Sequence, residues 1–291
     1  MAKLRHEIEY LFTRLGMGLA RSLSMPTADR FGAALGSLTH MLLGSRRRIA
    51  RDNLRQAFGS AFSEDQIDAL VRAVFRNTGR SLIDFSRMST ILEYGIDRLC
   101  VSDGLDNIEE AHRRGKGIIA VSAHFGSHEL FGAWIASRGI PTDIIVGIQH
   151  NEKVDRLING WRKQLGVGLI RVDTGIRDVF RSLKDNHIVA MLADQHAPNG
   201  IPIEFFGRKA AVAKGPAVFS LRSGAPILPF MLHRERFDRH IIEAGQPIYP
   251  PESGNNEEKI VRITEAYTAF IEDRIRAYPE QWLWTHRRWK I

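Results

Sequence analysis

The sequence predicts an α/β fold with a mainly parallel central sheet flanked by helices, preceded by an N-terminal helical membrane-contact region. Two observations predict the sheet: apolar, β-branched runs alternate with helical patterns, and polar residues directly follow two of those runs. The strand-like runs lie at 117–122, 142–148, 187–193 and 226–232. The helical stretches that alternate with them lie near 126–138, 151–164, 173–184 and 212–223. This alternation is typical of βαβ units, so the strands are expected to be parallel.

The remaining elements are helical apart from one short strand. Residues 46–58 and 64–92 have helical patterns, and Ser63 with Gln66 forms a capping box before the second. His240–Ala244 is expected to be an antiparallel edge strand, and a long helix over about 255–277 follows. We therefore expect two regions: membrane-associated helices over 1–45 and a single α/β domain over 46–291.

The first region has an apolar stripe that charged residues interrupt. The stripe of the helix at 4–24 consists of Leu4, Ile8, Leu11, Leu15, Leu19 and Leu23. Arg14 and Arg21 make it a poor spanning helix, so we expect it to lie in the bilayer interface, with Pro26 ending it. A second apolar helix at 27–43 leads into the basic cluster Arg46–Arg48, as expected beside anionic headgroups. The alternative is a helical hairpin that packs on the core and exposes a basic tip.

The charge of the chain points to an anionic partner. The 291 residues carry a formal net charge of +8, which favours an anionic membrane surface, an acidic protein or nucleic acid. Nucleic acid is the weakest of the three, because no helix-turn-helix, zinc finger or RNP-type motif is present. The single cysteine, Cys100, excludes an internal disulfide framework.

The segment around His124 carries the clearest sign of chemistry. His124 follows a buried strand, and Glu129 falls in the first turn of the next helix, so the two can meet at the sheet edge where α/β proteins bind ligands. The spacing favours a His–carboxylate pair at an active site, although a turn residue and a helix-start acid would look alike. Zinc binding by His124, His128 and Glu129 is disfavoured because the His-Glu-x-x-His order is absent. Ser127 is a poor nucleophile candidate, because no Gly-x-Ser-x-Gly elbow surrounds it.

Two later segments are candidates for binding. Asp194 and Gln195 follow another strand and should project at the same sheet edge as His124; the alternative is an Asx turn. After Phe205-Phe206-Gly207-Arg208 comes Lys214-Gly215-Pro216, which suits an anion held at a helix N-terminus.

Together these segments resemble the lipid A late acyltransferase family. His124-Phe125-Gly126-Ser127-His128-Glu129 is similar to the H-x4-(D/E) box of glycerolipid-type acyltransferases in its H-F-G-x-x-E form. Other similar blocks are Arg51-Asp52-Asn53-Leu54, Ala193-Asp194-Gln195, Phe205-Phe206-Gly207, Lys214-Gly215-Pro216-Ala217, Gly224-Ala225-Pro226 and the closing stretch from Tyr278 to Lys290. The chain departs from the family pattern at His128, where members often have Trp, and at Gln149-His150, where they often have Tyr-Arg-Pro. Arg162 is a possible substitute for that arginine.

The resemblance implies a glycerolipid acyltransferase-like fold and transfer of a fatty acyl chain from an acyl carrier protein thioester to a hydroxyl of a lipid A precursor. His124 would be the general base, Glu129 would orient its imidazole, and the backbone N–H groups of Phe125 to Ser127 would stabilise the oxyanion. No metal, cofactor or enzyme cysteine is needed. The residues expected to bind substrate are Gly126, Ser127, Arg162, Asp194, Gln195, Arg208, Lys214, Gly215 and Arg287.

The resemblance also implies a location and leaves alternatives open. The expected location is the cytoplasmic face of a bacterial inner membrane, with the anionic membrane surface as a further partner. A second enzyme hypothesis is a phospholipid or glycolipid acyltransferase that uses acyl-CoA or acyl carrier protein. A non-enzyme hypothesis is a membrane-peripheral lipid-binding protein. In the closing stretch, Arg287 or Arg288 either reaches an anionic group of the substrate or is structural.

Overall fold

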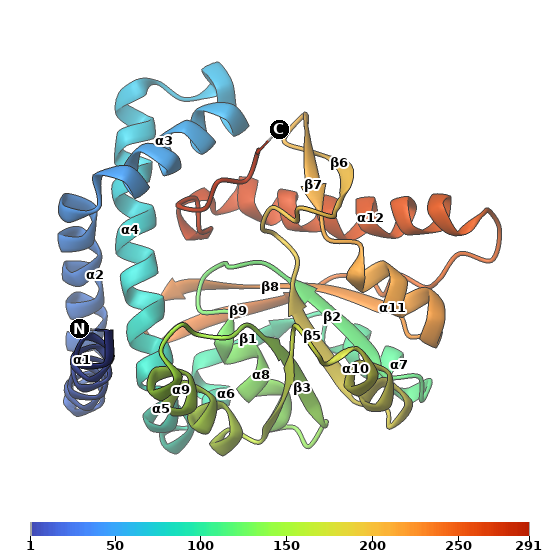
Figure 1. The fold of residues 1–291 in the computed structure, drawn as a ribbon, viewed down its shortest axis with the longest axis horizontal. Coiled ribbons are helices and arrows are strands. Elements are labelled where there is room, and N and C mark those ends of the chain that lie inside the picture. Colours follow the sequence, from blue (N-terminus) through green and yellow to red (C-terminus); the bar gives the residue numbers. More distant parts are fainter. Residues whose placement is uncertain (1, 291) are drawn as a thin grey trace.

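A seven-stranded sheet forms the centre of the molecule (Figure 1). The structure, a computed structural model, describes residues 2–290. The sheet has the order β1-β9-β8-β2-β5-β3-β4 and consists of β1 (Cys100–Asp103), β2 (Ile118–Ser122), β3 (Thr142–Val146), β4 (Val167–Arg171), β5 (Ile188–Leu192), β8 (Ile227–Arg236) and β9 (Arg239–Ala244). Every neighbouring pair is parallel except β8 and β9, so the predicted mainly parallel α/β sheet is confirmed.

The prediction for the strand near residue 240 is partly wrong. β9 pairs antiparallel with β8, as expected, but it is not an edge strand, because β1 pairs with its other side. β1 and β4 are absent from the predicted strands. The sequence of β1, Cys-Val-Ser-Asp, is short and half polar, and β4 contains Gly168, so neither has a continuous apolar run.

Helices cover both faces of the sheet (Figure 1). On one face lie α10 (Ile176–Lys184), α11 (Gly215–Ser223) and α12 (Asn256–Ala277). On the other lie α5 (Met88–Tyr94), α6 (Ile96–Leu99), α7 (Leu105–Arg113), α8 (Glu129–Ala136) and α9 (Glu152–Gln164). Alternating residues of each strand feed the two cores: Ile119 and Val121 pack with one, and Ile118 and Ala120 pack with the other.

The first four helices of the chain are α1 (Ala2–Ser22), α2 (Met25–Leu42), α3 (Gly44–Phe58) and α4 (Glu64–Ser86). Pro26 does not end the first helix but begins the second, because proline is tolerated in a first helical turn. The capping box of Ser63 and Gln66 is confirmed at the start of α4. The helix predicted for 64–92 is interrupted at Arg87, where α4 ends and α5 follows.

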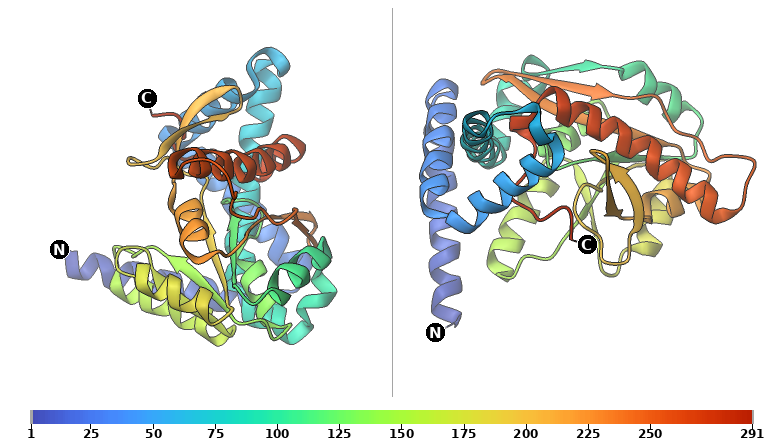
Figure 2. Two further views of the ribbon diagram at one scale, coloured as in Figure 1. Left: turned by 90° about the vertical axis from the view of Figure 1, so that its right-hand side faces the viewer. Right: turned by 90° about the horizontal axis from the view of Figure 1, so that it is seen from above.

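Glycines let α2 and α4 approach closely. A Cβ on Gly36 would lie 2.2 Å from the carbonyl oxygen of Phe75, and a Cβ on Gly79 would lie 2.2 Å from that of Gly32. Figure 2 shows α1 and α2 along one side of the molecule, beside α4. The side of α2 that faces α4 therefore lies in close backbone contact with it.

The outer side of this pair is apolar and exposed. On α1 the exposed large apolar residues are Leu4, Ile8, Leu11, Phe12, Leu15 and Leu19, and at the end of α2 they are Leu38, Met41, Leu42 and Leu43. Phe12 is 72% exposed, as is Met41. Among the described residues, no helix combines the length and the apolar character that crossing a bilayer requires.

A small hairpin and the C-terminal segment lie next to each other above the sheet. The hairpin consists of β6 (Ile201–Phe205) and β7 (Arg208–Val212), and its aromatic residues pack against Trp282 and Trp284. The buried Asn53 of α3 donates hydrogen bonds of 2.7 Å to the carbonyl oxygens of Trp284 and His286. Asn53 thus connects the N-terminal helices to the C-terminal segment.

Candidate active site

His124 and Asp194 meet at the carboxyl ends of two adjacent parallel strands. His124 lies two residues beyond β2, and Asp194 lies two residues beyond β5. The Nδ1 of His124 is 2.9 Å from Oδ1 of Asp194, and the backbone N–H of His124 donates to Oδ2 over 2.9 Å. The predicted position of Asp194 and Gln195 beside His124 is confirmed, since the amide of Gln195 lies 3.5 Å from the same ring nitrogen.

Three donors surround the Asp194 carboxylate, which is 5% exposed. Besides both His124 groups, the indole N–H of Trp282 donates to Oδ2 over 2.8 Å. Burial disfavours the carboxylate, but the charge and hydrogen bonds of His124 outweigh it and lower the pKa of Asp194 well below its usual range. Asp194 is therefore an ionised acceptor that fixes the ring of His124.

The pKa values of the two neighbouring imidazoles, those of His124 and His128, shift in opposite directions. Burial opposes protonation of His124, but the charge and hydrogen bond of Asp194 outweigh it and raise its pKa. Burial, together with the charge of His124, lowers the pKa of His128 to about 4. The two rings meet edge to face with centroids 5.4 Å apart. His124 is thus the basic member of the pair, and His128 is neutral at physiological pH.

Glu129 does not make the contact that the sequence suggested. Its carboxylate forms a bidentate ion pair with Arg162 of α9, with Nε of Arg162 3.2 Å from Oε2 and Nη2 contacting Oε1. The Nδ1 of His124 is bonded to Asp194 instead. The reason is topological: β2 and β5 are neighbours, so a residue 70 positions away reaches the imidazole ring, while Glu129 turns toward α9. Both Glu129 and Arg162 still line the cleft beside His124.

Gly126 and Ser127 are tied into the scaffold. Gly126 has φ +51°, and a Cβ there would lie 2.1 Å from the carbonyl oxygen of Leu232. Its N–H donates to the carbonyl oxygen of Gln281 over 3.0 Å, so this predicted oxyanion donor is occupied. The Ser127 hydroxyl is buried, donates to Asp84 and accepts from Arg234. The Gly126 N–H and the Ser127 hydroxyl are therefore both bonded within the protein, and substrate binding by these two residues stays a prediction.

A cleft of about 540 Å³ begins at His124 and runs between the sheet and helices α8 and α9. Its polar end is formed by His124, His128, Glu129, Arg162 and Gln195. Most of the remaining lining is apolar: Phe131, Gly132, Ile144, Ile145, Val146, Leu165, Val167, Val172, Ala190, Met191, Leu192 and Phe230. A polar end joined to a long apolar wall suits an amphiphile with a reactive head and a hydrocarbon chain.

A second, smaller cleft of about 240 Å³ also reaches His124. It is bounded by α4 through Thr78, Ser81, Leu82 and Phe85, and by the C-terminal segment through Gln281 and Leu283. His124, His128 and Glu129 line both clefts. His124 therefore lies where the two clefts meet.

Besides Ser127 and Asp194, four predicted binding residues lie outside both clefts. Arg208 is exposed in the hairpin, Lys214 is exposed before α11, and Gly215 begins that helix. Arg287 is exposed, whereas its neighbour Arg288 is 2% exposed. Arg288 donates to the carbonyl oxygen of Ala211 over 2.9 Å, and burial lowers its pKa to about 10. None of the four predicted residues lines either cleft, so their substrate contacts stay predictions.

Two residues of the C-terminal segment that hold His124 in place are absent from the predicted site. Trp282 secures Asp194, and the N–H of Leu283 donates to the His124 carbonyl oxygen over 3.0 Å. The signal was present in the tryptophan-rich closing stretch, but its partners are more than 80 residues away. Among the described residues, one group of three ligand side chains lies close enough together to hold a metal ion, namely His6, Glu9 and His150, and it lies outside both clefts.

This chain is similar in sequence to several acyltransferases. The lipid A biosynthesis palmitoleoyltransferase of Escherichia coli K12 is 26% identical over 97% of this chain and 92% of its own. The phosphatidylinositol mannoside acyltransferase of Mycobacterium tuberculosis is 26% identical over 76% of this chain and 71% of its own. The crystal structure of the 1-acyl-sn-glycerophosphate acyltransferase PlsC from Thermotoga maritima has a TM-score of 0.42 at 14% identity, over 88% of this chain and 100% of its own. The profile of bacterial lipid A biosynthesis acyltransferases matches residues 2–291. The chain therefore belongs to this family and is an acyltransferase.

Proposed function

We propose that this acyltransferase moves a fatty acyl chain from a thioester to a hydroxyl group of a lipid A precursor, with His124 as the general base. The observation that carries the proposal is the position of His124, held by Asp194 at the point where a long apolar cleft meets a second cleft. The apolar cleft suits the acyl chain of the donor, and the second cleft gives the acceptor hydroxyl access to the same imidazole.

The hydrogen bond to Asp194 sets the protonation of His124. Because Nδ1–H donates to the carboxylate, Nε2 carries the free lone pair. Nε2 takes the proton of the acceptor hydroxyl while its oxygen attacks the thioester carbonyl carbon. The tetrahedral intermediate then expels the thiolate, which takes the proton back from the imidazolium. Asp194 stabilises the imidazolium between these two proton transfers.

His128 and Arg162 act on the donor in this proposal. A neutral imidazole can donate an N–H to a developing oxyanion without first losing a proton, and the low pKa of His128 keeps it neutral. Arg162, held by Glu129 at the polar end of the apolar cleft, adds positive charge beside the thioester. Glu129 thus acts by positioning Arg162.

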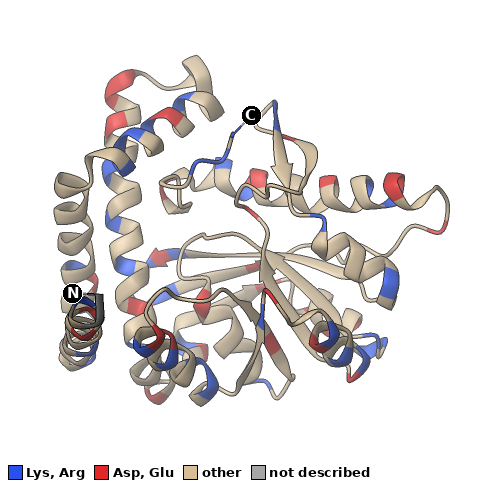
Figure 3. Cartoon of the chain, viewed as in Figure 1, with Lys and Arg blue, Asp and Glu red and all other residues tan. Residues whose placement is uncertain are grey.

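An acidic acyl carrier protein suits the charge of this molecule as the donor. Basic residues lie along α3 and α4 (Figure 3). Arg47, Arg48, Arg51 and Arg72 line a cleft of about 410 Å³ between these helices and the end of α2. Opposite surface charge steers association of the two proteins, and raising the salt concentration should weaken it. Acyl-CoA is the alternative donor.

The acceptor has a second candidate. The mannoside acyltransferase similar to this chain acts on a phosphatidylinositol mannoside, as its name states. A hydroxyl on another glycolipid is therefore the alternative to a lipid A precursor. Both acceptors present a sugar or acyl hydroxyl on an anionic lipid, so His124 would act in the same way on either.

Because the acceptor is a lipid, we place the reaction at a membrane surface, the cytoplasmic face of the inner membrane. The apolar outer side of α1, from Leu4 to Leu19, would lie in the bilayer interface. The arginines of α3 would then lie near the anionic headgroups. This arrangement keeps the two clefts near the lipid phase that supplies the acceptor.

The test supplies the purified protein with radiolabelled acyl carrier protein and acyl-CoA thioesters, each with a lipid A precursor or a mannosylated phosphatidylinositol. We expect transfer from the carrier protein to the lipid A precursor. His124→Ala should reduce the rate by about 10² to 10⁴-fold. The matched control is His187→Ala, which removes another carboxylate-bonded histidine, 2.7 Å from Asp143 and outside both clefts. Equal losses in the two variants would contradict the assignment of His124.

A further inference from the structure

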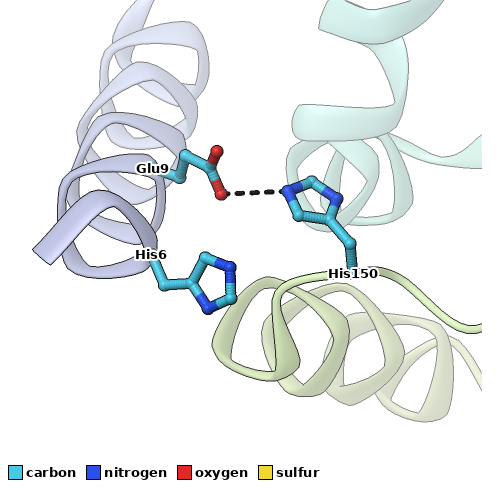
Figure 4. Close-up of side chains that lie close together, drawn as sticks. All are labelled: His6, Glu9 and His150. Atoms are coloured by element: carbon cyan, nitrogen blue, oxygen red, sulfur yellow. Dashed lines mark hydrogen bonds and ion pairs between the residues drawn. The ribbon is translucent and has the colours of Figure 1, made fainter. Parts of the chain in front are cut away.

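His6, Glu9 and His150 bring two imidazoles and one carboxylate together at the surface (Figure 4). His6 and Glu9 lie on α1, and His150 lies in the segment between β3 and α9. One ligand atom from each residue lies within 4.8 Å of the other two. Nε2 of His150 lies 3.0 Å from Oε2 of Glu9, and the rings of His6 and His150 meet edge to face with centroids 5.8 Å apart.

This donor set is one that zinc prefers. Two histidines and one glutamate form the protein ligands of many three-ligand zinc sites, with the fourth position left to water. Donor atoms around tetrahedral zinc lie roughly 3.4 Å apart, given bonds of about 2.0–2.1 Å. The three ligand atoms, all within 4.8 Å of one another, would have to move to reach that spacing. His150 has a 69% exposed side chain, so an ion can enter directly from solvent.

The surroundings orient the carboxylate for one bond to a metal. Arg5 donates to Oε1 of Glu9 over 3.0 Å, and Oε2 faces Nε2 of His150. Asn151, which is 1% exposed, donates to Oε2 over 3.1 Å and to the carbonyl oxygen of His6 over 2.8 Å. A buried amide therefore holds the His6–Glu9 turn of α1 in register with His150. Such secondary contacts fix the orientation of metal ligands.

We propose that His6, Glu9 and His150 bind a divalent transition-metal ion of the zinc type, which fastens α1 to the rim of the apolar cleft. The connection follows from the order of residues in the sequence. Gln149, directly before His150, lines that cleft, as does Gly147. A bond from α1 to His150 therefore restrains the segment that borders the cleft. The proposed metal site can be tested independently of the acyl-transfer reaction, because the experiment measures metal binding and not activity.

Zinc binding is measured by isothermal titration calorimetry on the full chain, and cobalt substitution reports the ligand field by visible absorption. We expect one zinc ion per chain. His6→Ala, Glu9→Gln and His150→Ala should each weaken binding by more than about 10-fold, since changes to secondary contacts alone cost 10–100-fold. His187→Ala is the matched control, because His187 pairs with Asp143 and belongs to no such group of three among the described residues. It should bind zinc like the wild type.

Hydrogen exchange with and without zinc measures whether the metal ion holds α1 against the rim of the apolar cleft. Zinc should slow exchange in α1 and in residues 147–157 of the wild type, and have no effect on His150→Ala. Circular dichroism and thermal melting confirm that each variant is folded. The proposal is overturned if the wild type shows no saturable zinc binding, if the three variants bind as tightly as the control, or if binding leaves the exchange of α1 unchanged.

Discussion

Replacing Asp194 by Asn tests the arrangement that the proposed mechanism depends on. The change keeps the size of the side chain but removes its charge and one acceptor atom. The Asn oxygen can still accept from Trp282 and the His124 N–H, so its amide group then faces Nδ1 of His124. An amide donor favours the tautomer in which Nδ1 accepts and Nε2 carries the proton. That tautomer cannot act as a base at Nε2.

The expected magnitude follows from this change of tautomer. In a serine protease the same replacement beside the catalytic histidine lowers kcat by about 10⁴-fold. We expect a loss of about 10³ to 10⁴-fold here, because Asp194 is 5% exposed and water cannot replace it. Loss of a hydrogen bond to a charged group should also lower the free energy of unfolding by about 1.5–3 kcal/mol.

The pH dependence of activity and of stability tests the role of Asp194 independently. Asp194 raises the pKa of His124, so Asp194→Asn should lower it and shift the acid limb of kcat/KM to lower pH. The raised pKa of His124 also stabilises the folded state. This stabilisation is complete below the reference pKa of 6.5 and is lost as the pH rises through the folded-state pKa of His124. The lowered pKa of Asp194 stabilises the folded state as well. This stabilisation is complete above the reference pKa of 3.8 and is lost as the pH falls through the folded-state pKa of Asp194. The stability difference between wild type and variant should be largest between these two reference values.

The assay is steady-state acyl transfer over a pH series, together with urea unfolding at the same pH values. The control is Asp143→Asn, which removes the carboxylate beside His187. It should leave the acid limb of kcat/KM in place. If Asp194→Asn keeps its rate within a few-fold and shows the same acid limb as the wild type, Asp194 does not set the protonation of His124 and the reasoning is refuted.

Three further predictions concern the scaffold, the apolar cleft and the membrane surface. Gly126→Ala should lower the free energy of unfolding by more than about 2 kcal/mol in urea unfolding, because φ is +51° and a Cβ would lie 2.1 Å from a carbonyl oxygen; an unchanged midpoint would contradict this. Gly132→Leu should shift the preferred donor to shorter acyl chains in competition assays, since Gly132 lines the cleft with Val167 and Ile144 nearby; an unchanged product distribution would place the chain elsewhere. Phe12→Ser should weaken flotation with anionic liposomes, whereas the same change at the buried Phe131 should act on stability; normal flotation of Phe12→Ser would argue against contact through α1.

Local patterns in the sequence were enough to predict the elements that stand at the centre of the fold. The buried runs of β2 and β5 are short, apolar and β-branched, and each is followed by polar residues. Since parallel neighbours end at the same sheet edge, His124 and Asp194 could be expected together before any coordinates were known. The capping box at Ser63 was equally readable, because it involves residues three positions apart.

Contacts between distant residues required the tertiary structure. Two carboxylates were available to His124, and the sequence favoured Glu129 because it is near in the chain; strand pairing gave the position to Asp194 instead. The same holds for Asn53 and Trp282, whose partners lie 231 and 88 residues away. Side-chain periodicity reports which face of an element is buried, but it contains no information about which element covers that face. The sequence therefore determined the histidine and its place at the sheet edge, while packing between distant segments decided its partner and the two clefts that reach it.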